Sequence, residues 1–177
     1  METPLIIANI IGFLACVITL YSFQRKGARE IFFSQIFSTA LWAVHFVLLG
    51  AFSGAVMNIG NMIKAICLVY LDEKHVKKFV IAFVLILAGV FFCYIYEKPS
   101  DLLPLVSVTL GACLMFVRDN RYIVARISII DAICWTIYAV IEKSIPGLVT
   151  DILIIISITT GMVRHEEKPF KPFRLKP

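Results

Sequence analysis

Residues 79–96 read FVIAFVLILAGVFFCYIY, and this stretch decides the fold class. Between Phe79 and Cys93 it contains no polar side chain. An α-helix needs roughly 20 mainly apolar residues to cross the hydrocarbon core of a bilayer, with a minimum near 17. A helix satisfies its own backbone hydrogen bonds inside lipid, and an apolar run of this length is not a barrel strand. The stretch therefore predicts a transmembrane helix that faces lipid and carries no chemistry.

The rest of the chain has the same character. Of its 177 residues, 60% are hydrophobic and 16% are charged, and the mean hydropathy is +0.90. Ordinary soluble domains are roughly 45–50% apolar and about 25% charged. A water-soluble chain of this size could not hide so much apolar surface in one core. The composition therefore predicts an all-α, multi-pass membrane protein.

Short charge clusters and Gly/Pro turns divide the chain into seven apolar windows. The predicted transmembrane helices are Pro4–Ser22, Ile31–Gly50, Phe52–Leu71, Phe79–Tyr96, Asp101–Val117, Tyr122–Ile141 and Ile145–Val163. Glu2 precedes the first of them and no Lys or Arg does, so a signal-peptide n-region is missing and we expect this helix to be retained.

The basic residues alternate from loop to loop, which predicts the orientation. Fourteen lie on one side of the predicted membrane and two, Lys98 and Lys143, lie on the other, while Lys64 falls within a helix. The positive-inside rule then places the N-terminus outside and the C-terminus in the cytoplasm. The basic tail, residues 164–177, is predicted to be disordered near anionic lipid headgroups, and we expect no binding to nucleic acid.

An offset of 93 residues superposes part of the chain on itself. It gives 7 identities over the 39 positions from Leu20 to Asn58, and it aligns the two tryptophans of the chain, Trp42 and Trp135. Three helices per unit require one more crossing to give both units the same direction. We therefore predict a 3+1+3 arrangement of parallel repeats. The first repeat is residues 1–71, the linker helix with its loops is 72–100, and the second repeat is 101–163.

Polar side chains recur on matching helix faces of the two units. Each tryptophan precedes a polar residue by 16 positions, so that Trp42 pairs with Asn58 and Trp135 pairs with Asp151. Indole faces pack on ring-shaped solutes or attract cations, and Asn and Asp supply directional hydrogen bonds. Polar residues at membrane depth usually point into a bundle or cavity. The pattern predicts a substrate-binding site made of Trp42, Asn58, Trp135, Asp151, Ser38, Asp131, His45, Tyr138 and Asn61.

Structural interpretations of the same residues remain open. Tryptophans also anchor helices at interfaces, and hydroxyl side chains such as Ser38 join helices by hydrogen bonds. For His45 we favour a satisfied packing role. Lys64 either extends its amine to the cytoplasmic surface or pairs with Asp131. The five dispersed cysteines are expected to be buried and not to bind metal, and no cofactor is implied.

The Trp-then-Asn spacing in a 3+1+3 chain resembles the SWEET and SemiSWEET sugar transporters of the PQ-loop superfamily. The stretch FFSQIFSTALWAVHFVLLGAFSGAVMNIGNMIK, residues 32–64, is more specifically similar to the YgjV family of bacterial inner-membrane proteins. The resemblance covers roughly residues 8–163. It implies an inner-membrane location and a central solute site formed by Trp42, Asn58, Trp135 and Asp151.

Two departures from the superfamily pattern affect the expected activity. Asp151 replaces an asparagine, which favours a cationic, proton-coupled or differently hydroxylated solute. The proline-glutamine element that would supply a hinge in each first helix is missing, and Pro104 is the residue that breaks a helix.

The leading hypothesis is therefore a SWEET-like transporter that moves a small polar metabolite across the bilayer by alternating access. Whether it forms a homo-oligomer is left open. The alternative is a membrane receptor or scaffold of the same fold that transports nothing. An enzyme is disfavoured, because the sequence contains no nucleophile elbow, HExxH motif or metal-spaced cluster.

Overall fold

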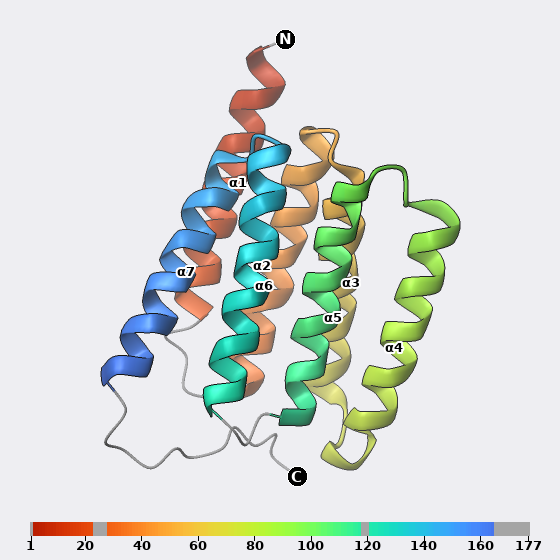
Figure 1. Ribbon diagram of the computed structural model, residues 1–177. Helices are drawn as coiled ribbons and strands as arrows, with labels where there is room; N and C mark the ends of the chain where they lie inside the picture. The colour runs from red at the N-terminus through yellow and green to blue at the C-terminus, as the bar shows by residue number, and fades with distance from the viewer. Residues whose placement is uncertain (1, 23–27, 118–120, 165–177) are drawn as a thin grey trace.

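The computed structural model describes residues 2–22, 28–117 and 121–164, and all elements within these ranges are helices (Figure 1). The α-helices are α1 (Glu2–Ser22), α2 (Ala28–Leu48), α3 (Phe52–Tyr70), α4 (Glu73–Tyr94), α5 (Leu102–Val117), α6 (Arg121–Ile141) and α7 (Ile145–Arg164). A short 3₁₀ turn, η1 (Pro99–Asp101), leads into α5. The predicted all-α fold is confirmed for the described part of the chain.

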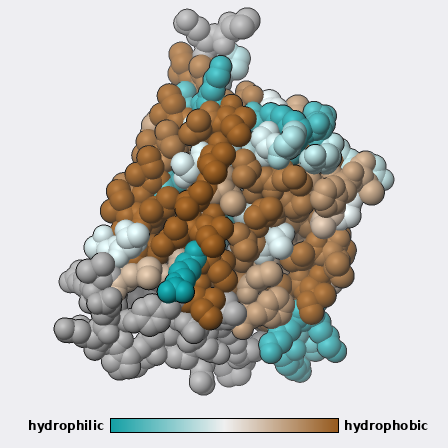
Figure 2. Space-filling view, viewed as in Figure 1, coloured by the Kyte–Doolittle hydropathy of each residue, from teal (hydrophilic) through white to brown (hydrophobic). Residues whose placement is uncertain are grey.

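Six of these helices are long and apolar enough to cross a bilayer, and α7 contributes a shorter apolar stretch, Ile145–Thr160. Apolar side chains cover the middle of the surface and hydrophilic ones gather near its ends (Figure 2). On α4, for example, Leu85 is 68% exposed and Ile86 is 66% exposed. Exposed apolar surface of this extent requires an apolar solvent. The bundle is therefore a multi-pass membrane protein.

The helix boundaries differ most from the prediction at α4. This helix begins at Glu73, whereas the apolar window begins at Phe79. Lys74, Lys77 and Lys78 are exposed, and lysine is a good helix former, so the helix continues beyond the apolar segment. Hydropathy detects the part of a helix that is in lipid and not the whole helix.

Helix packing is most extensive within two sets of consecutive helices, α1–α3 and α5–α7, which are called the first and second halves below. In the first half, α2 packs against α1 and α3, and in the second half, α6 packs against α5 and α7. The halves meet along two seams, one between α1 and α7 and the other between α3 and α5. Helix α4 lies at the edge of the bundle and packs on α3 and α5 (Figure 1).

One face of α4 is buried and the other is exposed. Phe91 is fully buried in an apolar cluster that includes Met57 of α3 and Val108 of α5. The opposite face carries Cys93, which is exposed. The expectation that all five cysteines are buried is confirmed for Cys16 and wrong for Cys93, and the other three are partly exposed. A thiol behaves as a small hydrophobe and is compatible with a lipid-facing surface.

The two ends of the bundle carry different connections. The upper end in Figure 1 holds the start of α1 and the connections at residues 49–51, 95–98 and 142–144, and the lower end holds the connection at 71–72. Lys98 and Lys143 are at the upper end, and the lysines of the first turns of α4 are at the lower end. The tail and Arg25, Lys26 and Arg118, which contribute to the orientation prediction, lie outside the described residues.

The hairpins at 49–51 and 142–144 have the same backbone geometry at the 93-residue offset. Gly50 and Lys143 occupy equivalent positions, and both have positive φ angles, 75° and 56°. The next residue in each hairpin donates to an equivalent carbonyl: Ala51 N to Phe46 O at 2.9 Å, and Ser144 N to Ala139 O at 2.8 Å. The left-handed backbone conformation costs a non-glycine residue roughly 1–2 kcal/mol. The second hairpin adopts it at Lys143 despite this cost.

Candidate functional site

A cavity of about 390 Å³ lies inside the bundle. Its wall is built by α1, α2, α3, α5, α6 and α7, and α4 contributes no side chain to it. Seven of the nine residues that the sequence predicts for a binding site line this cavity, namely Ser38, Trp42, Asn58, Asn61, Asp131, Trp135 and Asp151. The cavity lies within the size range of small-molecule pockets, about 300–1,000 Å³.

The two tryptophans and their polar partners lie at one depth. Trp42 and Trp135 each lie six residues before the last residue of their helix, and Asn58 and Asp151 each lie six residues after the first residue of theirs. All four of these helix termini are at the upper end. At 1.5 Å per residue, the four residues form a layer about 9 Å below the helix ends. This layer is called the Trp–Asn/Asp layer below.

The α6 side of the cavity repeats the α2 side at the same 93-residue offset. Each α6 lining residue corresponds to an α2 lining residue, in the pairs Gln35/Ser128, Ser38/Asp131, Thr39/Ala132, Trp42/Trp135 and Phe46/Ala139. The same face of both helices therefore points into the cavity. The side chains differ at four of the five positions, so the two sides of the cavity are geometrically alike and chemically distinct.

Phe46 separates the two tryptophans at the upper part of the cavity. Its ring centroid lies 6.0 Å from that of Trp42 and 5.8 Å from that of Trp135, with interplanar angles of 31° and 23°. The indole N–H of Trp42 donates to the hydroxyl of Thr19 at 3.1 Å. Because this polar group is already occupied, Trp42 offers the cavity an apolar ring and not a hydrogen-bond donor.

Three charged side chains line the cavity. Asp131 accepts a hydrogen bond from Ser107 and is attracted electrostatically by Lys64. Lys64 is directed across the bundle, since its amine lies 3.5 Å from the point where a Cβ on Gly111 of α5 would be. Among the two sequence-based interpretations of Lys64, this placement favours interaction with Asp131 over extension to the membrane surface. Asp151 makes no hydrogen bond or ion pair within the described part of the chain.

His45 is placed outside the cavity wall and joins the two halves at the α1–α7 seam. Its Nδ1 lies 2.7 Å from Ala8 O of α1, and its Nε2 lies 2.7 Å from Ser144 Oγ at the start of α7. A carbonyl can only accept, so Nδ1 donates, and in a neutral ring Nε2 then accepts from the serine hydroxyl. Both ring nitrogens are thereby satisfied, as the packing interpretation of this histidine predicts.

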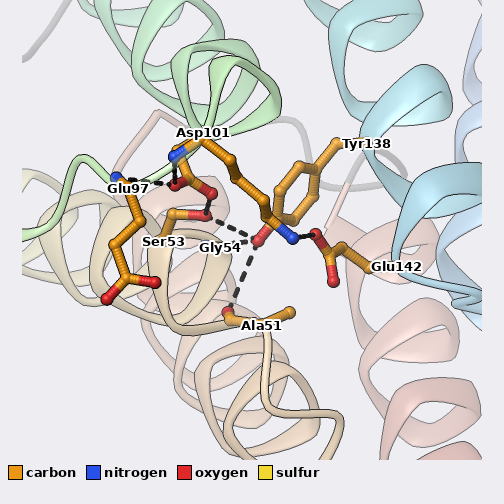
Figure 3. A network of polar contacts seen from close by, with 8 residues as sticks. Ala51, Ser53, Gly54, Glu97, Asp101, Tyr138 and Glu142 are labelled. Atoms are coloured by element: carbon orange, nitrogen blue, oxygen red, sulfur yellow. Dashed lines mark hydrogen bonds and ion pairs between the residues drawn. The ribbon is translucent and has the colours of Figure 1, made fainter.

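Tyr138 is also outside the cavity wall and joins the halves at the α3–α5 seam (Figure 3). Ser53 Oγ donates its one proton to Asp101 Oδ1 at 2.7 Å, so in its 2.8 Å contact with Tyr138 OH it accepts. Gly54 N donates to the same tyrosine oxygen at 2.8 Å. The result is a buried chain of donors that runs from Gly54 through Tyr138 and Ser53 to the carboxylate of Asp101. Such chains polarise one another and are strengthened by it.

The upper connection before η1 is fastened to this chain. Asp101 Oδ2 accepts from the backbone N–H of Glu97 at 3.1 Å and of Lys98 at 3.0 Å. The Lys98 amine donates to Glu142 Oε1 at 2.6 Å, and this hydrogen bond to a carboxylate raises the pKa of Lys98 above its usual range. The connection before α5 is thus tied both to α3 and to the hairpin that follows α6.

The cavity wall extends toward the lower end of the bundle. Above the aromatic rings, the hydrogen bonds of His45 and Tyr138 join both seams. In the other direction the wall reaches Leu68 and Met115, each two residues from the end of its helix. Hydrogen bonds across both seams therefore lie between the Trp–Asn/Asp layer and the upper end of the bundle.

The predicted site and the cavity wall share the same helices but differ by one position on two of them. It predicted His45 and Tyr138 at the end of each polar stripe, whereas the wall continues at the next residue, Phe46 and Ala139. The helical repeat of 3.6 residues could have indicated this. In a helix that is not supercoiled, the residue four positions after Trp42 lies nearer the face of Trp42 than the residue three positions after it. The sequence also did not single out Ser53, Asp101 and Ser144.

Comparison with known proteins gives one family. A family model, Imp-YgjV, described as bacterial inner membrane protein, matches residues 6–168. No curated protein and no solved structure matches the chain. Within the described residues, no group of three or more His, Cys, Asp or Glu side chains is arranged to hold a metal ion.

Proposed function

The chain belongs to the Imp-YgjV family of bacterial inner membrane proteins, and we propose that it transports a small polar solute across that membrane by alternating access. The reaction is translocation without covalent change. The cavity is the solute site, and the Trp–Asn/Asp layer is its centre. The observation that carries the proposal is that both halves of the bundle contribute matched residues to one cavity, to which the remaining helix, α4, contributes none.

The arrangement that this function requires is 3+1+3, with all seven helices crossing the membrane. The two halves are parallel repeats, and α4 reverses the chain direction between them. The equal geometry of the two hairpins and the paired lining of α2 and α6 support this arrangement. It is the arrangement of the SWEET-like proteins of the PQ-loop superfamily, and proteins with such parallel repeats bind solute between the repeats.

In the proposed orientation the lower end faces the cytoplasm. The excess of Lys and Arg in the lower connections supports it, according to the positive-inside rule. In this orientation the hydrogen bonds of His45 and Tyr138 across the seams lie on the outer side of the cavity, and the cavity wall extends toward the inside. Release to the outside requires that the contacts of His45 and Tyr138 across the two seams break while equivalent contacts form below the cavity.

Counterflow in proteoliposomes tests the transport proposal. A thermal-stability screen of the purified protein against sugars, amines and organic acids selects the labelled solute, because ligand binding stabilises the folded state. We expect saturable counterflow with the wild type and loss of at least about 90% of it in the Trp42→Ala/Trp135→Ala double variant. Stacking of a flat ligand ring on one aromatic side chain contributes roughly 1–3 kcal/mol when the ligand is a nucleic-acid base, and the double variant removes two such rings.

The matched control is Phe92→Ala, which removes an aromatic ring of α4 that is 60% exposed. This variant is expected to transport as the wild type does. Detergent elution volume and melting temperature establish that each variant is folded. Wild-type counterflow in the folded double variant would contradict the assigned site.

One observation favours the alternative, a receptor or scaffold that binds solute without moving it. Every proline in the described residues lies in η1 or in the first three residues of a helix, at Pro4, Pro99, Pro104 and Pro146. The helices therefore contain no proline hinge at mid-membrane. Saturable binding without counterflow in the same proteoliposomes would select this alternative over transport.

A further inference from the structure

The charges on the cavity wall do not balance. Among the described lining residues, Lys64 is the one cation, and Asp131 and Asp151 are the two anions. Lys64 and Asp131 attract each other electrostatically, so they offset one another. Asp151 is the remaining charge, and the wall with all three groups ionised has a formal charge of −1.

The unbalanced carboxylate lies in the part of the cavity where a solute meets the tryptophans. Asp151 belongs to the Trp–Asn/Asp layer, six residues into α7. Lys64 lies twelve residues into α3, which places its backbone about 9 Å lower along the bundle. An unpaired carboxylate at membrane depth must either take up a proton or gain a compensating charge, and a cationic ligand beside Asp151 supplies that charge.

Several hydrogen-bond donors around this layer are already used within the protein. The Trp42 indole N–H donates to Thr19, the Thr150 hydroxyl donates to Pro146 O at 2.7 Å, and the Asn58 amide donates one N–H to Gly54 O at 2.9 Å. The groups left to a solute at this depth include the Asp151 carboxylate, the carbonyl oxygen and second N–H of Asn58, the Trp135 indole N–H and the indole faces. Of these, the carboxylate and the indole faces fit a ligand that is positively charged.

We propose that the solute of this cavity is a small organic cation, an ammonium compound, whose charged group lies beside Asp151 and against the faces of Trp42 and Trp135. This inference rests on the proposed function and specifies its substrate class. Carboxylate and indole act together: the first attracts the charge, and the second replaces part of its hydration shell. A neutral sugar of the same size gains only the stacking contribution.

A pair of isosteres provides the test. Choline and 3,3-dimethylbutan-1-ol have the same shape and hydroxyl group and differ in one atom, a quaternary nitrogen against a carbon. Trp42 and Trp135 are the two tryptophans of the chain, so intrinsic fluorescence of the purified full-length protein reports on this site. We expect choline to change the fluorescence saturably and to bind about tenfold or more tightly than the neutral isostere.

Three variants locate the origin of that preference. Asp151→Asn is expected to abolish the tenfold preference, and Asp151→Glu, which retains the charge, is expected to preserve most of it. Asp72→Asn removes an exposed carboxylate in the connection before α4 and is expected to leave the preference unchanged.

Equal affinity for the two isosteres, no saturable response to choline, or a preference that survives in Asp151→Asn would each overturn the cation assignment. None of these results bears on transport itself. A neutral solute that shows tryptophan-dependent counterflow would leave the proposed function intact while refuting the proposed substrate class.

Discussion

The two seams between the halves of the bundle are held by equivalent positions with different chemistry. At the α1–α7 seam, His45 reaches Ala8 on α1 and Ser144 in the opposite hairpin. At the α3–α5 seam, Tyr138, the equivalent of His45 at the 93-residue offset, reaches the other hairpin through Ser53. In both cases an aromatic side chain with a polar tip crosses from the central helix of one half to the hairpin of the other.

The difference between the seams lies in what completes each network. Ala8 contributes a backbone carbonyl, whereas its equivalent in the second half is Asp101, whose carboxylate accepts three hydrogen bonds, from Ser53 Oγ and from the backbone N–H groups of Glu97 and Lys98. The α3–α5 seam is also covered by α4, and the α1–α7 seam is not. The positions at which the halves are joined are therefore equivalent in the two repeats, whereas the number of hydrogen bonds at each position differs. We expect the α1–α7 seam to open first.

The largest expected effect comes from the glycines under these aromatic rings. A Cβ on Gly54 would lie 2.6 Å from Tyr138 Cε1, and a Cβ on Gly12 would lie 2.8 Å from His45 Nδ1. Gly54→Ala and Gly12→Ala should each lower the free energy of unfolding by about 2–3 kcal/mol, because the ring must leave its hydrogen-bonded position. Unfolding of the purified protein in detergent measures this change.

Gly89→Ala on α4 is the control for both glycine variants, since a Cβ there meets no atom within 4 Å. It should leave stability unchanged or raise it by up to about 1 kcal/mol through helix propensity. If Gly54→Ala were as stable as Gly89→Ala, the close packing at the seam would be refuted.

A smaller effect is expected from Tyr138→Phe, which removes the hydroxyl and preserves the ring. The buried N–H of Gly54 then loses its acceptor, at a cost of about 1–2 kcal/mol. The loss should be coupled to that of Ser53→Ala in a double-mutant cycle, because both residues belong to one hydrogen-bonded chain. Tyr94→Phe, whose residue is 82% exposed on α4, should change nothing. Strict additivity of Tyr138→Phe and Ser53→Ala would argue against the chain.

The smallest effect concerns the ion pair at the surface of the α3–α5 seam. Glu142→Gln removes the partner of Lys98, whose side chain is 51% exposed, and should cost less than about 0.5 kcal/mol because solvent screens the pair. The pKa of Lys98 is raised in the folded state, so the contribution is complete at neutral pH and disappears as the pH rises through that raised pKa.

Unfolding of wild type and Glu142→Gln, measured from neutral to strongly alkaline pH and at low and high salt, checks this expectation. The two proteins should become equally stable at high pH, and the difference should shrink with salt. Asp72→Asn, which breaks an exposed pair with Lys74 at 3.8 Å, should show no difference at any pH. If the difference in unfolding free energy between wild type and Glu142→Gln became larger at alkaline pH, the stabilising role of the Lys98–Glu142 ion pair would be contradicted.

Most of the helices could be predicted from the sequence because the hydrocarbon core requires runs of apolar residues. Such runs can be recognised from the hydropathy of consecutive residues alone. The start of α3 at Phe52 and the end of α6 at Ile141 agree with the predicted spans. The Trp42/Trp135 correspondence likewise indicated which faces would meet in a cavity. The beginning of α4 at Glu73 was missed because lysine is a good helix former and continues the helix beyond the apolar run.

The seam networks could not be predicted in the same way. Ser53 and Asp101 are separated by 48 residues and Tyr138 follows 37 residues later, so no local spacing relates them. A serine and an aspartate near a turn are also ordinary capping residues. The significance of these side chains appears only when the two halves are placed against each other.

Helix α4 connects the two halves but takes no part in lining the cavity. It also reverses the chain direction between them. A bundle of this kind can be divided: a fragment ending after α3 and a fragment beginning before η1, co-expressed, contain every lining residue. In the intact chain, α4 links the direction in which the second half inserts into the membrane to that of the first half. In the split protein, the second fragment would have to obtain its direction of insertion from its own flanking charges.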